Sequence, residues 1–360
     1  MISRQKEQLF LIKATLVAFG VFITSNIVVY THIDFGFLSI VTAFVLLQLF
    51  FSELRKKAIE RIFGPTLSAI LILIILMIFQ DHYVLMLLSI AILLMIFVYY
   101  FVVGYFSYSM ILGAITISLI SAMDIDKNLF QAMHLGLYWV INLLIGSIVV
   151  IMIDFIASRW IFEKKLLNKI EDIETKKSFF SLKKHWRNWR EKSKFNYKAA
   201  IVAIRVAATF IILLLVNRKM QWSFIDIQAV IAGIIVSAQP SISLTHQRAL
   251  MRALGVVVGA VIAIGFAYLL QINPSLFLTV ILITGSLGIL TLLSENYRFY
   301  EYAFLQAGVM IPLILITSNQ EIINVHLAFE RSLGSFEGGL VAIAMVYLSA
   351  LFFVDERRNQ

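Results

Sequence analysis

The chain has 360 residues and a formal net charge of +9, and 61% of its residues are apolar while 14% are charged. Soluble domains are about 45–50% apolar and about 25% charged, so this composition excludes an ordinary soluble enzyme and indicates an integral membrane protein. The absence of cysteine excludes disulfides, thiolate catalysis and zinc–cysteine sites. No P-loop pattern occurs, and we therefore expect no built-in ATP hydrolysis.

Apolar segments follow one another along the chain, each near the ~20 residues that a membrane-spanning helix needs. They lie at about 9–31, 36–51, 64–79, 84–102, 106–122, 135–157, 199–216, 224–238, 253–270, 275–293, 302–318 and 332–354. The stretch 84–122 is divided because, as one helix, it would be about twice the ~30 Å thickness of the hydrocarbon core. The predicted fold class is all-α, a polytopic membrane protein with about 12 transmembrane helices.

The distribution of lysine and arginine predicts the orientation. If the N-terminus is inside, most of the 30 basic residues fall in segments on the cytoplasmic side. We therefore expect a multi-pass protein of the cell (cytoplasmic) membrane with cytoplasmic N- and C-termini.

The two halves of the chain resemble each other. The segment SELRKKAIERIFG at 52–64 aligns with SLTHQRALMRALG at 243–255, and at nearly the same spacing Lys13 aligns with Arg205. An even number of spans in each half predicts parallel repeats about an axis along the membrane normal. The predicted domains are a six-helix module at 1–158, a linker at 159–198 and a second six-helix module at 199–360.

The predicted linker, 159–198, holds 13 basic and 5 acidic residues. Its apolar residues recur at helical spacing, and its end mixes Lys and Arg with Phe and Trp. This composition is typical of an amphipathic segment that lies on anionic lipids. We expect a cytoplasmic linker that binds anionic lipids and no nucleic acid.

Several motifs of the second half occur in a fixed order. Arg205 lies inside the first helix, Trp222 opens the next, VIAGIIVSAQP occupies 230–240, and QRALMRALG at 247–255 is followed by Gly259. This order resembles the fusaric acid resistance (FUSC) family, which includes aromatic acid exporters. The resemblance implies a multi-pass inner-membrane protein that exports small organic anions.

We therefore expect gradient-driven export of small organic anions, especially aromatic carboxylates, and neither enzyme activity nor a cofactor. Two alternatives remain open. One is a passive organic-anion channel, and the other is a non-transporting membrane scaffold or lipid-interacting assembly factor that uses the linker. The sequence also leaves open whether the chain forms a homo-oligomer.

An anion that crosses the hydrocarbon core needs positive charge along its path. The candidates for substrate binding are Lys13, Arg205, Arg61, Arg252 and Arg331. The alternative role of Lys13 and Arg205 is to reach the inner interface as anchors. For Arg61 and Arg252 the alternative is a plain topology signal.

Two further groups of residues carry predictions. Glu337 and Asp226 are candidates for proton coupling, because an ionisable carboxyl within a span can carry a proton. Four small residues at repeat-matched positions predict close helix packing: Gly64, Ser68, Gly255 and Gly259. The histidines lack paired spacing, and so no metal site is expected.

Overall fold

The computed structural model describes residues 2–48, 51–124, 129–160, 195–220, 225–316 and 325–353, and every regular element in these residues is a helix. The helices of the first half are α1 (Ile2–Thr31), α2 (Phe37–Leu47), α3 (Phe51–Phe79), α4 (Tyr83–Val103), α5 (Ser107–Asp124) and α6 (Leu129–Trp160). Those of the second half are α9 (Tyr197–Met220), α10 (Ile225–Ser237), α11 (Ile242–Ile272), α12 (Leu276–Asn296), the 3-10 helix η1 (Arg298–Tyr300), α13 (Glu301–Leu315) and α14 (Val325–Phe353). The predicted all-α class is confirmed.

Eight of the described helices are long and apolar enough to cross a membrane. The helices α2, α5, α10 and α13 have only 11, 18, 13 and 15 residues. At 1.5 Å per residue they rise about 16–27 Å, less than the ~30 Å hydrocarbon core. The chain is a polytopic membrane protein, and the expected number of twelve spans stays a prediction, because each of these four short helices borders residues outside the described ranges.

The predicted division between the fourth and fifth helices is confirmed. Gly104 follows α4 with φ 85°, a left-handed conformation that glycine adopts without strain. Its N–H donates to the carbonyl of Phe101, and the N–H of Tyr105 donates to the carbonyl of Tyr100. These bonds end α4, and α5 starts three residues after Gly104.

The helices α3 and α11 begin earlier than their apolar segments. Residues 52–63 lie outside the apolar segment predicted at 64–79 but are continuous with it in α3, and residues 243–252 are continuous with the apolar part of α11 in the same way. Hydropathy marks where the apolar residues begin, whereas a helix begins where its backbone hydrogen bonds begin. Each charged segment is therefore fixed rigidly to a long helix.

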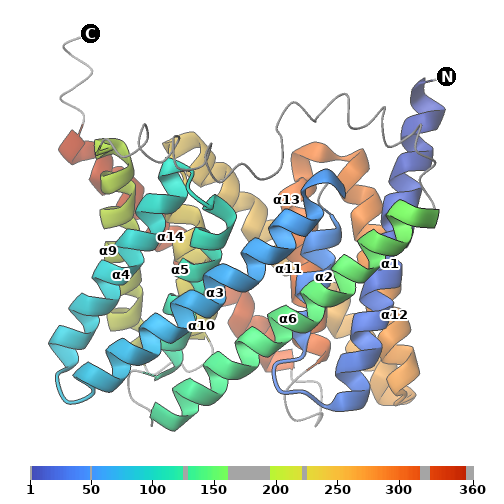
Figure 1. The fold of residues 1–360 in the computed structure, drawn as a ribbon, viewed down its shortest axis with the longest axis horizontal. Coiled ribbons are helices and arrows are strands. Elements are labelled where there is room, and N and C mark those ends of the chain that lie inside the picture. Colours follow the sequence, from blue (N-terminus) through green and yellow to red (C-terminus); the bar gives the residue numbers. More distant parts are fainter. Residues whose placement is uncertain are drawn as a thin grey trace.

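The two halves of the chain share their hydrophobic cores. α1 packs along α12 of the other half, and α9 packs along α4 in the same way. In Figure 1, α1, α2, α12 and α13 lie on one side of the view, and α4, α5, α9 and α14 lie on the other. Each side therefore contains helices from both halves, which cannot separate without breaking two interfaces.

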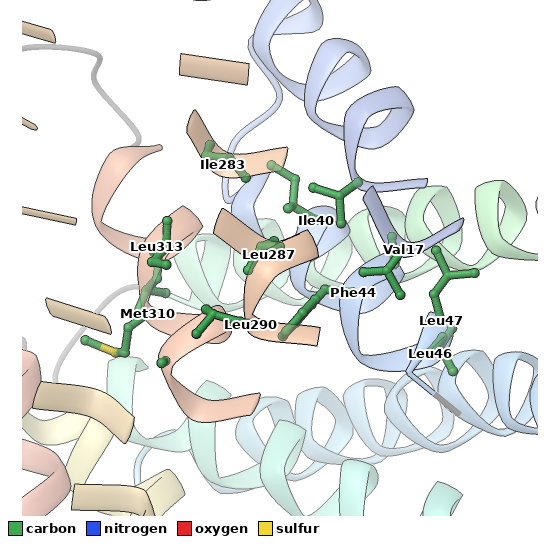
Figure 2. Packing of buried hydrophobic residues seen from close by; sticks show 14 of the residues in the cluster. Val17, Ile40, Phe44, Leu46, Leu47, Ile283, Leu287, Leu290, Met310 and Leu313 are labelled. Atoms are coloured by element: carbon green, nitrogen blue, oxygen red, sulfur yellow. The ribbon is translucent and has the colours of Figure 1, made fainter. Parts of the chain in front are cut away.

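Figure 2 shows one of these shared cores. Phe44 of α2 is fully buried and lies near Leu287 and Leu290 of α12, and Met310 of α13 belongs to the same cluster. Lipid chains are as apolar as these side chains, so van der Waals packing rather than transfer out of water holds such a core together.

Helix pairings recur in the two halves. α2 packs on α6 as α10 packs on α14, and α3 packs on α5 as α11 packs on α13. The start of α1, the end of α6, the start of α9 and the end of α14 all lie toward the upper part of Figure 1. This arrangement fits two repeats that run in the same direction.

Candidate functional site

The segments with matching sequences lie at matching helix crossings. A Cβ atom added to Gly64 on α3 would be 2.0 Å from the carbonyl oxygen of Ser109 on α5, and one added to Gly255 on α11 would be 2.2 Å from that of Ala303 on α13. The absence of a side chain thus lets the two backbones touch. Each crossing brings the first turn of α5 or α13 against the charged segment of α3 or α11.

The next small residue in each repeat lies one turn further along. A Cβ atom on Gly259 would be 2.5 Å from the carbonyl oxygen of Ala307 on α13. Ser68 is fully buried, and its hydroxyl donates to the carbonyl of Pro65 at 2.9 Å. Both positions lie within the helix contacts that Gly255 and Gly64 begin.

In the first repeat, Arg61 is 7% exposed and its guanidinium is bonded within the protein. Its Nε donates to the hydroxyl of Thr42 on α2 at 3.2 Å, and its Nη1 donates to the hydroxyl of Tyr108 on α5 at 2.5 Å. Arg61 therefore joins three helices of its own half.

A carboxylate lies beside Arg61 in the sequence. Glu60 is 6% exposed, and its oxygens are 3.5 Å from Nζ of Lys57 and 3.8 Å from Nζ of Lys56. The ammonium of Lys57 also lies 5.0 Å from the ring centroid of Tyr108. The positive charges of this segment thus face an acid that the segment itself supplies.

In the second repeat, Arg252 is 5% exposed, and its Nε has no hydrogen-bond partner among the described residues. No hydrogen bond or ion pair to any part of its guanidinium occurs in the described ranges. The repeat alignment places Gly233 or Ile234 where the first repeat has Thr42, and neither has a side-chain oxygen. A charged group is therefore buried without the acceptor that its counterpart has.

The neighbours of Arg252 add polar groups, and no acid among the described residues forms an ion pair with it. The guanidinium carbon of Arg248 lies 4.4 Å from the ring centroid of Tyr302 on α13. The hydroxyl of Tyr302 is buried and has no hydrogen-bond partner in the part of the chain that the structure describes. Met251 stands at the position of Glu60. The exposed Glu301 forms no ion pair within 4.0 Å with the two arginines.

The other predicted anion contacts have partners that hold the fold together. The ammonium of Lys13 forms an ion pair with Glu295 of α12, which belongs to the other repeat. Arg205 donates from Nε and Nη2 to the carbonyl of Ser237 at 3.0 and 2.7 Å, and from Nη2 to that of Gln239 at 2.5 Å. A helix leaves its last carbonyls unbonded, and a cation there satisfies them. Arg205 therefore caps α10.

Arg331 is held in a similar way near the end of α13. Its Nη1 donates to the carbonyl of Leu313, and its guanidinium carbon lies 5.9 Å from the ring centroid of Phe37. Arg205 and Arg331 are thus bonded to the ends of two different helices, and the structure does not bring the five predicted cations together.

The predicted proton-coupling residues lie on α14 and α10. Both carboxylate oxygens of Glu337 are buried. The following residue, Gly338, is packed so closely that an added Cβ would be 2.0 Å from the carbonyl oxygen of Ala229 on α10. The side chain of Asp226 lies outside the described residues.

The sequence analysis missed Tyr302, whose hydroxyl and ring both belong to the Arg252 site. A signal was present, because Tyr108 and Tyr302 occupy the second position of α5 and of α13. The predicted lipid-binding linker falls mostly on residues 161–194, which lie outside the described ranges.

Comparison with known proteins gives one informative result. No match was found among curated proteins or among solved structures. The family model described as fusaric acid resistance protein-like matches residues 17–153 and 207–345, one stretch in each half of the chain. These two matches cover most of both repeats and indicate a transporter-type role. The chain therefore belongs to the fusaric acid resistance protein-like family.

Proposed function

We propose that this chain exports small organic anions, especially aromatic carboxylates, across the cytoplasmic membrane, and that Arg252 is the principal contact of the anion. The single observation behind this proposal is a guanidinium that is 5% exposed and has no partner among the described residues. Family membership supports a transporter-type role.

The physical argument starts from the cost of an unpaired charge. Removal of an ion from water costs several kcal/mol unless an opposite charge or hydrogen bonds compensate it. A carboxylate compensates a guanidinium well, because its two oxygens match two N–H groups. Arg252 is therefore suited to a carboxylate that arrives from solution.

The neighbouring groups favour an anion over a cation. Arg248 adds a second positive charge one helical turn from Arg252, and the hydroxyl of Tyr302 can donate a further hydrogen bond. A cation would be repelled by both arginines. The ring of Tyr302 supplies an aromatic surface, which supports an aromatic carboxylate within the class of organic anions.

The test measures efflux of radiolabelled benzoate from proteoliposomes. We expect Arg252→Gln to lower the initial rate at least tenfold, because a hydrogen bond to a charged group contributes about 1.5–3 kcal/mol. Lys56→Gln is the matched control, since it also removes one positive charge but from an exposed side chain. Equal benzoate rates in wild type and Arg252→Gln would contradict the proposal.

The same vesicles test whether a gradient drives export. We propose that Glu337 contributes to proton coupling, because its carboxylate oxygens are buried inside the protein. Benzoate should then accumulate against its own gradient when a proton gradient is imposed, and an uncoupler or Glu337→Gln should abolish that accumulation. A passive channel would instead only dissipate the benzoate gradient, with or without the uncoupler.

A further inference from the structure

The charged segments of α3 and α11 are two versions of one site. Residues 52–64 and 243–255 align without a gap, and both end in the glycine at the helix crossing. Arg61 matches Arg252, and Lys57 matches Arg248. Glu60, which pairs with Lys57, matches Met251.

The first version supplies its own anion, although Oε2 of Glu60 has no hydrogen-bond partner among the described residues. The buried carboxylate of Glu60 lies 3.5 Å from the ammonium of Lys57, and Arg61 is bonded to the hydroxyl of Tyr108 at 2.5 Å. Anion, cation and phenol are thus all supplied by α3 and α5. No external anion is needed to balance this site.

The second version lacks two of these features. Met251 is buried and apolar where Glu60 is charged. Arg252 and Tyr302 remain, but the bond that joins their counterparts is missing, and both keep unused donors within the described residues. The groups that bind a carboxylate are present and the carboxylate is absent.

We infer that the second repeat binds one monocarboxylate ligand in the place that the Glu60 carboxylate has in the first repeat. The ligand carboxylate lies beside Arg248, as that of Glu60 lies beside Lys57, and accepts hydrogen bonds from the unused donors of Arg252 and Tyr302. The first repeat is occupied by its own glutamate, so each chain binds one ligand. This inference rests on the proposed function and adds to it the position, the number and the class of the ligand.

The experiment titrates radiolabelled benzoate onto the full chain in nanodiscs of phosphatidylcholine, which carries no net charge. Wild type should saturate at one benzoate per chain. Met251→Glu should lower the affinity at least tenfold, because it installs in the second repeat the carboxylate that the first repeat has. Gln247→Glu is the matched control, since it adds the same charge to the same turn on an exposed side chain, and it should bind as wild type does.

A second variant tests the first repeat. Glu60→Met removes its resident carboxylate and should raise the saturation value from one to two benzoates per chain. A value that stays at one would contradict the idea that Glu60 occupies the first site. Unchanged affinity in Met251→Glu would contradict the position assigned to the ligand.

Three further outcomes separate this inference from its competitors. If wild type exports benzoate, but Met251→Glu exports and binds it equally well, the inference is wrong while the proposed function stands. If wild type neither binds nor exports benzoate, both are wrong. If phosphatidylglycerol in the nanodisc lowers the benzoate saturation value, the occupant is a lipid phosphate and the inference is wrong.

Discussion

The two repeats carry matching arginines that lie in different surroundings. Arg61 is bonded to hydroxyls of α2 and α5, whereas Arg252, at the same position of the same kind of helix, has no partner among the described residues. The backbone crossings beneath them are alike, because Gly64 and Gly255 both touch a carbonyl of the neighbouring helix. The two repeats thus share one backbone arrangement but differ in the partners of the matching arginine.

The largest expected effect tests the shared scaffold. Gly255→Ala and Gly64→Ala should each destabilise the protein by about 3 kcal/mol or more, because the new Cβ atom would overlap a backbone carbonyl that cannot move alone. The measurement is thermal unfolding in detergent, followed by fluorescence-detected size-exclusion chromatography.

Gly265→Ala is the control for these glycine variants. No atom lies within 4 Å of the Cβ position of Gly265, and alanine favours a helix by about 1 kcal/mol over glycine. The control should therefore be as stable as wild type or slightly more so. Equal losses at Gly265 and Gly255 would show that backbone contact is not what makes Gly255 sensitive.

A smaller effect on the free energy of unfolding is expected when the matching arginines of the two repeats are replaced. Arg61→Gln should lower the free energy of unfolding by about 1–3 kcal/mol, because it removes a charge-assisted bond to Tyr108 and one to Thr42. Arg252→Gln should leave it unchanged or raise it, since a buried charge without a protein partner is removed. The measurement is the free energy of unfolding of each variant, determined by denaturation without any added carboxylate.

Added benzoate sharpens this test. Saturating benzoate should stabilise wild type and Arg61→Gln but not Arg252→Gln, because only a protein that binds the ligand in its folded state gains stability from it. Equal stabilisation of both arginine variants would show that the two repeats do not differ in this way.

The smallest expected effect concerns the first helix of each repeat. Lys13→Gln and Glu295→Gln should show a coupling energy of about 1 kcal/mol in a double-mutant cycle, because the two side chains form an ion pair between the repeats. Arg205→Gln combined with Glu295→Gln should be additive, since Arg205 bonds to the end of α10 instead. Coupling of equal size in both cycles would contradict this assignment.

Much of the fold could be predicted from the sequence. Hydropathy located every described helix, and Gly104 explains why the apolar stretch around it forms two helices. The number of spans stays a prediction, because the described parts of α2 and α10 are apolar but shorter than the hydrocarbon core and are packed among other helices. Hydropathy measures preference for an apolar environment, which protein and lipid both provide.

The candidate site was predicted only in part. Arg252 was among the predicted cations, but so were Lys13, Arg205 and Arg331, and nothing in the sequence distinguished them. The distinction depends on partners that are distant along the chain, such as Glu295 for Lys13, 282 residues away. Tyr302 was missed because a single tyrosine at a helix start is common, and only its neighbours make it notable.

The sequence alone determined the membrane environment, the helices, the duplication and the family, because each of these follows from local composition or from residue order. Only the tertiary structure decided which repeat-matched cations are neutralised and which is not. Charge compensation acts over a few ångströms of space rather than along the chain, so it depends on how helices from both halves pack around one another.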